Sequence, residues 1–193
     1  MTPTAIRDVR FATARSTLSR PIADATHAIP EIRFVVATLE LGNGVTGQSH
    51  LLAFHYSPHA IAGACRDLEA FLRGRDVTAT ERVIRDWDAE SEYFGRSGIN
   101  RWALGLANIA MWDARGKLAG APVWKLLGGS AKPIPVYGSG GWLSYSDDEL
   151  VDEVTGYVKR GFAAVRSRSA RRIRRATSSA CGVCARRSGR ACA

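Results

Sequence analysis

The order of apolar and polar residues begins with a strand-rich region. Residues 5–11 and 31–41 alternate apolar with polar side chains, which is typical of strands that bury one face. The Gly-Asn-Gly turn at 42–44 and the alternation that resumes after it predict a hairpin or meander. A polar segment with two prolines, residues 16–30, separates the first two strands. Its length predicts a functional or mobile loop.

After these strands the apolar period changes to that of a helix. Apolar residues recur at helical spacing between Pro58 and Gly74, and a capping box of Thr78 with Glu81 predicts a second helix. The third predicted helix, 99–118, is rich in alanine and apolar on most faces, which predicts burial. The expected unit at 1–130 is therefore an α+β domain, an antiparallel meander plus helices.

A different order follows at 131–165. A short apolar strand at 133–137 leads into the glycine-rich turn 138–141, and 162–165 opens a second strand. A capping box of Ser146 with Glu149 predicts the helix between them. Strand, helix and strand in this order predict one βαβ unit, whose strands are parallel.

The net charge of +9 is concentrated in one short segment. Residues 1–165 contain 18 Lys and Arg and 18 Asp and Glu, whereas 166–193 contain nine arginines and no acid. Three of the four cysteines also lie in 166–193. The composition therefore excludes a chain that is basic or cysteine-rich throughout. No apolar run approaches the ~20 residues of a membrane helix, and the first residues contain no apolar signal core, so we expect a cytoplasmic protein without membrane contact.

Two functional interpretations of 166–193 are open. Cys181 and Cys184 have the spacing of a metal or redox pair, but no second pair stands at zinc spacing. The arginines favour contact with nucleic acid, although no aromatic residue is present for base stacking. Because branched aliphatic residues are scarce, the expected state is disorder. The alternative function is thus a non-catalytic binding module whose basic tail contacts nucleic acid.

Residues 107–129 resemble the enolase superfamily, and in particular its mandelate racemase/muconate lactonizing enzyme family. The family signature is a buried helix with Ala, then an Asp, a Gly-Lys pair, a Pro and Leu-Leu-Gly-Gly. The matching positions here are Ala107, Asp113, Gly116, Lys117, Pro122, Gly128 and Gly129. The likeness covers about residues 4–165, and a structural role is expected for Asp113.

The resemblance implies a capping domain over a (β/α)-barrel, of which 131–165 is the incomplete start. It also implies an enzyme that binds a small carboxylate, a sugar acid or hydroxy acid, on Mg²⁺. A Lys or His then removes the proton alpha to the carboxylate. The outcome is racemisation, cycloisomerisation or dehydration, with acid-sugar dehydratases as the nearest likeness. Intact members are often homo-oligomers.

The chain departs from the family after Val165. The family has Lys-x-Lys at the end of the second barrel strand, where this chain has Arg166-Ser167-Arg168. Arginine stays protonated and is a poor general base. The later acidic metal ligands and the His-Asp pair do not follow, and a full barrel needs ~250 residues. We therefore expect no catalytic residue and no bound cofactor in this chain, with Mg²⁺ belonging to the intact family.

A single-base deletion accounts for this departure. With GC-rich codons and one extra A before the codon of Arg166, the same bases read KVKVGAADPAGDLERVRRVREAIGPGVR. That sequence restores Lys-x-Lys and continues into an amphipathic helix. We interpret 166–193 as a disordered frame-shift product, and the chain as a truncated, inactive family member.

The resemblance also indicates residues that would face a substrate. The loop 16–28, with Arg20, Asp24 and His27, matches the mobile specificity loop of the family by position. His55 is expected near the active-site mouth, and Ser139 follows the first barrel strand, where it would bond a substrate carboxylate. Each of these assignments has an alternative. The loop 16–28 is then an ordinary polar surface loop, and His55 is a surface histidine, as are His50 and His59, with which it would otherwise form a zinc site. Ser139 then belongs to a plain tight turn; the glycines around it also resemble a phosphate loop, but the lysine of that motif is missing.

Overall fold

Contacts divide the chain into two units. The computed structural model describes residues 2–54, 58–94 and 96–168. The first unit contains Met1–Ser16 and Glu31–Ala131, and the second contains Thr17–Pro30 and the chain from Lys132 onwards. The tip of the first hairpin thus belongs with the later part of the chain.

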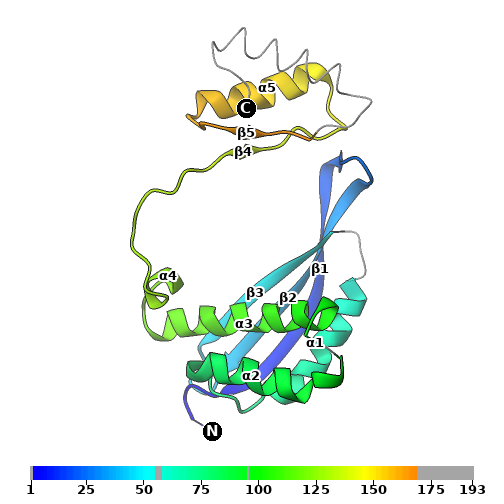
Figure 1. Ribbon diagram of the computed structural model, residues 1–193. Coiled ribbons are helices and arrows are strands. Elements are labelled where there is room, and N and C mark those ends of the chain that lie inside the picture. The colour runs from blue at the N-terminus through cyan, green and yellow to red at the C-terminus, as the bar shows by residue number, and fades with distance from the viewer. Residues whose placement is uncertain (1, 55–57, 95, 169–193) are drawn as a thin grey trace. The chain divides into compact units, whose positions relative to one another are not determined.

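Three strands form the sheet, in the order β1-β2-β3 (Figure 1). They are β1 (Ile6–Ala23), β2 (Ala28–Leu41) and β3 (Thr46–Phe54). β2 and β3 are antiparallel, with Phe34 opposite Leu52 and Glu40 opposite Thr46. The alternation at 31–41 is confirmed, because every second residue from Val35 to Leu41 is buried.

The predicted loop at 16–30 is wrong for most of its length, since β1 runs to Ala23 and β2 begins at Ala28. Pro21 is compatible with a strand here because β1 is at the edge of the sheet, where a missing N–H breaks no ladder. The turn that remains is closed by Asp24, whose Oδ1 accepts hydrogen bonds from the N–H groups of Thr26 and His27, both at 2.8 Å.

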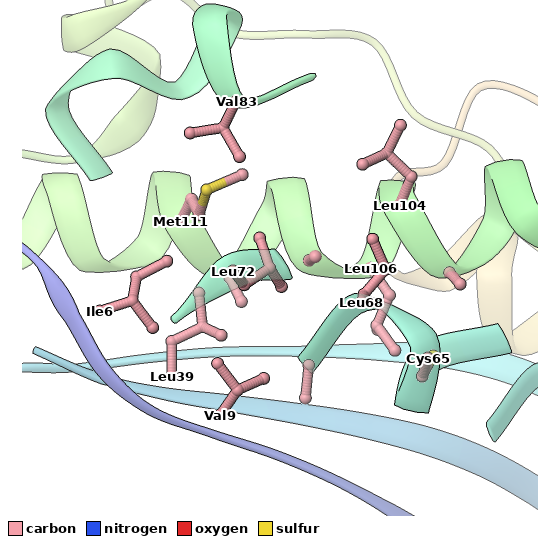
Figure 2. Close-up of a cluster of buried hydrophobic side chains, with 14 of the residues drawn as sticks. Ile6, Val9, Leu39, Cys65, Leu68, Leu72, Val83, Leu104, Leu106 and Met111 are labelled. Atoms are coloured by element: carbon pink, nitrogen blue, oxygen red, sulfur yellow. The ribbon is translucent and has the colours of Figure 1, made fainter. Parts of the chain in front are cut away.

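Helices α1 and α3 lie on one face of the sheet, and α2 packs against α3 (Figure 1). The helical elements of this unit are α1 (Pro58–Leu72), η1 (Val77–Ala79), α2 (Thr80–Glu90), η2 (Glu92–Phe94), α3 (Gly98–Leu118) and α4 (Val123–Leu126). Between sheet and helices lies one hydrophobic core, drawn in Figure 2. Its fully buried members include Ile6, Leu39, Leu68, Leu106 and Met111.

Two helix predictions need correction. The capping box of Thr78 and Glu81 does not form, because Thr78 lies inside the short turn η1, which Asp76 caps by accepting a 2.8 Å hydrogen bond from the Thr78 N–H. The N-cap residue of α2 is Ala79, which has no side chain able to cap. The helix α3 is buried along one stripe only. Trp102 and Ile109 on its other side are 55% and 57% exposed.

The described part of the second unit contains one βαβ element, as predicted. It consists of β4 (Gly138–Ser139), α5 (Asp147–Lys159) and β5 (Val165–Arg166), and the two strands are parallel with Gly138 opposite Val165. The capping box of Ser146 and Glu149 is present. The predicted strand 133–137 is wrong in its bounds, since within the described residues this segment forms no ladder and the strand lies at 138–139. Two of its five residues are prolines, which have no N–H group to donate.

None of the helices in the described ranges combines the length and the apolar character that crossing a membrane requires.

Candidate functional site

The carboxyl ends of β4 and β5 lie side by side, with Ser139 opposite Arg166. In parallel α/β folds, substrates bind at this edge of the sheet. Ser139 is exposed there, and its carbonyl oxygen accepts a 2.9 Å hydrogen bond from Tyr157 of α5. Ser139 is thus the last residue of β4 rather than part of a turn after the strand, and its contact with a substrate stays a prediction.

The glycines beside Ser139 let α5 approach the strand closely. A Cβ at Gly138 would overlap the Tyr157 ring, and one at Gly140 would overlap the Glu153 carboxylate. The Gly141 N–H donates a 2.6 Å hydrogen bond to Glu153 Oε2. The Gly141 N–H is thus bonded to a carboxylate of α5, which argues against a phosphate loop. The predicted turn at 138–141 is wrong in its bounds, because Gly138 and Ser139 belong to β4 and the turn lies at 143–144.

Arg168 is held against the loop that follows β4. Its guanidinium lies 3.3 Å from the centroid of the Trp142 ring, and Nη1 donates a 3.0 Å hydrogen bond to the Gly140 carbonyl. The Arg168 backbone N–H donates to the Gly141 carbonyl at 3.2 Å. A stacked guanidinium is a permanent cation and cannot accept a proton. The sequence did not indicate Trp142, because nothing local pairs it with Arg168.

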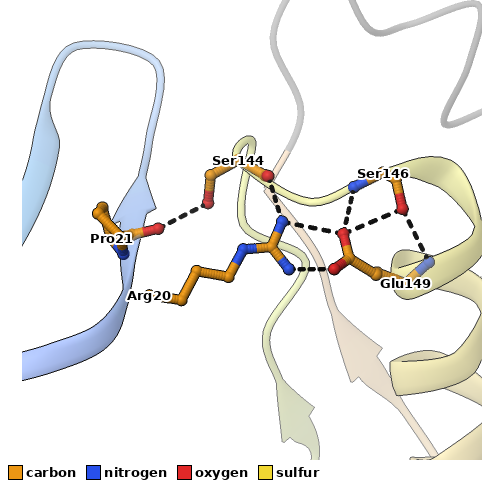
Figure 3. Close-up of polar contacts among 5 residues, drawn as sticks. All are labelled: Arg20, Pro21, Ser144, Ser146 and Glu149. Atoms are coloured by element: carbon orange, nitrogen blue, oxygen red, sulfur yellow. Dashed lines mark hydrogen bonds and ion pairs between the residues drawn. The ribbon is translucent and has the colours of Figure 1, made fainter.

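Arg20 is bonded to the segment before α5 (Figure 3). Its guanidinium contacts both carboxylate oxygens of Glu149, at 2.9 Å for Nη2–Oε2, and Nη2 also donates to the Ser144 carbonyl at 2.6 Å. These hydrogen bonds from Arg20, and then those from Ser146, lower the pKa of Glu149 to about 2. The sequence indicated Glu149 only as a helix cap and did not indicate Ser144.

Asp24 and His27 belong to the turn between β1 and β2. The hydrogen bonds from the N–H groups of Thr26 and His27 lower the pKa of Asp24 to about 2. Thr26 Oγ1 lies 2.7 Å from His27 Nδ1. The structure therefore brings Asp24 and His27 together in one turn, where the carboxylate stabilises the backbone.

The remaining candidates are separated or lie outside the described residues. His55 falls outside them, as do Cys181, Cys184 and the rest of 169–193. The His50 ring meets the Phe34 ring edge-on, with the ring centroids 5.8 Å apart. His59 instead lines a cavity of about 350 Å³ together with Arg15 and Arg33. Across the described ranges, no group of three His, Cys, Asp or Glu side chains is arranged to hold a metal ion.

The signature residues are packing residues of the first unit. Asp113 Oδ2 accepts hydrogen bonds from the Gln48 N–H at 2.8 Å and from Lys117 Nζ at 2.7 Å, so it joins α3 to β3. Ala107 is fully buried in α3. The other signature positions shape the chain around α4. Gly116 and Gly129 leave room for the carbonyl groups of Ala121 and Trp124, which a Cβ would approach to 3.0 Å or less. Pro122 is the N-cap residue of α4, and Gly128 has a φ of +77°.

The described residues do not fit the Mg²⁺ that the resemblance implies. Magnesium takes carboxylate and carbonyl oxygens. At the ends of β4 and β5, however, Glu153 is bonded to Gly141, and the strand that should carry a base ends in Arg166 and Arg168. No step of a reaction can be derived through a metal here.

Comparison with known proteins agrees with the fold. Residues 6–128 match the model of the mandelate racemase/muconate lactonizing enzyme N-terminal domain. The chain is 29% identical over 168 residues to 3,6-anhydro-alpha-L-galactonate cycloisomerase of Streptomyces coelicolor, covering 86% of this chain and 46% of that protein. It is 33% identical over 135 residues to arabinonate dehydratase of Saccharolobus solfataricus, covering 68% of this chain and 36% of that protein.

A solved structure extends this likeness. An enolase from Bradyrhizobium complexed with magnesium and mandelic acid is 31% identical, with a TM-score of 0.75 over 86% of this chain and 46% of that chain. The chain thus spans less than half the length of each of these three relatives. Its match to the family model over residues 6–128 places it in the mandelate racemase/muconate lactonizing enzyme family.

Proposed function

We propose that this chain is a catalytically inactive member of its family, and that the intact parent is a Mg²⁺-dependent enzyme acting on a sugar acid or hydroxy acid. The parent would remove the proton alpha to the carboxylate, as a dehydratase or racemase. The names of the relatives, an arabinonate dehydratase and a 3,6-anhydro-alpha-L-galactonate cycloisomerase, support this class of substrate. A cytoplasmic location belongs to the same proposal.

The observation that carries the proposal is the pair of arginines at the end of β5. Proton abstraction needs a group that is neutral for part of the time near pH 7. A guanidinium stays protonated at every ordinary pH and does not meet this need. The guanidinium of Arg168 is moreover stacked on the Trp142 ring, which fixes its positive charge against the loop after β4.

The test is turnover of a panel of acids by the purified chain. Arabinonate, galactarate and mandelate would be offered with Mg²⁺ in deuterium oxide, and both product and deuterium at the alpha carbon would be measured. We expect neither, with arabinonate dehydratase as the positive control. Deuterium incorporation by the chain would show that a base is present and would refute the proposal.

A matched variant separates two causes of inactivity. R166K/R168K restores the Lys-x-Lys pattern without adding any metal ligand. We expect it to remain inactive, because an enediolate without a cation is not stabilised. Activity in this variant would mean that the arginines alone block the reaction.

We also propose that the sequence from residue 166 is out of the family's reading frame. The expected finding is one additional A between the codons of Val165 and Arg168, either in an ancestral gene or in the resequenced gene itself. Resequencing decides between these cases. An unchanged gene whose relatives encode the same arginine-rich segment would refute the frame shift.

The second candidate function is nucleic-acid binding by 166–193. The observation in its favour is nine arginines without a single acidic residue. Such binding should weaken steeply with salt and disappear when 166–193 is removed. Binding that survives the removal would place the contact elsewhere.

A further inference from the structure

We propose that Arg20 is a positioning residue that fixes the tip of the β1–β2 hairpin to the segment before α5. We call the contacts of Arg20 with Ser144 and Glu149 the latch. The latch goes beyond the proposed function and rests on it in one respect only, namely that the hairpin tip would face substrate in the parent. Under this proposal Arg20 holds the tip and does not receive the carboxylate of an acid.

The geometry of the latch is bidentate. The two terminal nitrogens of Arg20 meet the two oxygens of Glu149, and one of them also bonds the Ser144 carbonyl (Figure 3). The guanidinium carbon lies 4.7 Å from the centroid of the Tyr145 ring. Arginine presents the planar fork that matches a carboxylate, whereas lysine presents a single point charge. The site therefore selects arginine over lysine.

Two further hydrogen bonds act in parallel with the latch. Ser144 Oγ donates to the Pro21 carbonyl at 3.1 Å, and the Leu143 N–H donates to the Ala23 carbonyl at 3.0 Å. Two residues that follow Arg20 on β1 are thus bonded to the same segment. This agrees with the contact division, in which Thr17–Pro30 belongs with the chain from Lys132 onwards.

The latch shares its carboxylate with the start of α5. Glu149 Oε2 accepts a 2.7 Å hydrogen bond from the Ser146 N–H, which completes the capping box. One carboxylate therefore both begins the helix and binds the hairpin. Loss of Arg20 should disturb the hairpin tip and the first turn of α5 together, which a residue that stabilised only its own hairpin would not do.

Hydrogen exchange measured by mass spectrometry on the full chain tests the latch without any substrate. In R20A we expect exchange of residues 17–30 and of 143–149 to rise together by about tenfold, the loss typical of hydrogen bonds to a charged group. R20K keeps the positive charge but not the planar fork of the guanidinium. Its rise in hydrogen exchange should be smaller than that of R20A. This experiment contains no sugar acid or hydroxy acid and measures no turnover. Its failure would therefore refute the latch without bearing on the proposed function.

The matched control is R7A. Arg7 also lies on β1 and also pairs with a glutamate, Glu40, but it lies in the first unit. Its substitution should leave exchange at 17–30 and 143–149 unchanged. The proposal is overturned if R20A leaves 143–149 unchanged, or if R7A raises exchange there equally.

Exchange at Val35–Leu41 reports whether each variant keeps its fold. If R20A loses protection there as well, the variant is unfolded and E149Q is measured instead. E149Q removes the carboxylate that binds Arg20, but glutamine can still complete the capping box of α5. E149Q should then raise exchange at 17–30 severalfold while Val35–Leu41 stays protected. No rise in that variant also overturns the proposal.

Discussion

Buried apolar side chains are distributed very unevenly between the two units. Except for Ile29 at the hairpin tip, every fully buried apolar residue in the described ranges belongs to the first unit. In the second unit, α5 has a correct cap and an apolar stripe, yet none of its residues is fully buried. Local rules for a helix can thus be satisfied without a core, because a two-stranded sheet offers too little surface to cover the stripe.

The largest effect should come from a pair of truncations that compares the two units. Leu68→Ala removes a fully buried side chain and should lower the free energy of unfolding by about 2–5 kcal/mol. Val154→Ala, on the half-buried face of α5, should cost about 1 kcal/mol or less. Urea unfolding followed by circular dichroism measures both. Equal losses would mean that α5 has a core of its own.

The next effect concerns the close approach of β3 to α3. A Cβ at Gly47 would overlap the Ala110 carbonyl and lie 2.8 Å from Ala114 Cβ. Gly47→Ala should therefore cost about 1–3 kcal/mol through overpacking. The control is Gly105→Ala within α3, where a Cβ meets nothing within 4 Å and should stabilise the helix by up to about 1 kcal/mol. Thermal unfolding of both variants measures the difference, and a stabilised Gly47→Ala would contradict the packing.

A smaller effect is expected at the signature aspartate. Asp113→Ala removes the acceptor that ties the Gln48 N–H to α3, and should cost about 1 kcal/mol. Asp88→Ala is the matched control, since Asp88 is also half-buried but, within the described residues, bonds the Arg101 side chain and no backbone N–H. An ion pair with a largely exposed partner is worth between about 0 and 1 kcal/mol. Urea unfolding compares the two. If both variants lose the same stability, the signature Asp is no more than a surface charge.

The sequence predicted those features whose cause is local. Alternation at 31–41, the cap of α5 and the signature motif each depend on residues within a few positions of one another. The hairpin tip was misjudged because Pro21 fits a strand only at a sheet edge, and sheet order is a long-range property. Arg20 and Glu149 are 129 positions apart, so no periodicity could pair them. Asp76 and Thr78 are both residues that can cap a helix, and they lie within three positions of each other. The pattern favoured Thr78, but the structure has Asp76 as the N-cap residue of η1.

The smallest effect is the loss of hydrogen-exchange protection around the latch as the pH falls. It is also the effect that best separates the latch from the hydrophobic core. The pKa of Glu149 is lowered from 4.5 to about 2, and that of Asp24 from 3.8 to about 2. A lowered pKa in the folded state means that the stabilising contribution is complete above the ordinary values and is lost as the pH falls towards 2. Protection of 17–30 and 143–149 should therefore be constant from pH 7 to about 5 and decline between about 4.5 and 2.

E149Q removes the contribution of Glu149 but leaves the turn of Asp24 intact. Its protection at 143–149 should already be low at pH 7 and change little with acid, whereas 17–30 should still respond as Asp24 takes up its proton. Hydrogen exchange at fixed pH steps, corrected for the intrinsic rate at each pH, gives both profiles. If the two proteins had the same profile at 143–149, the acid response of this segment would not come from Glu149.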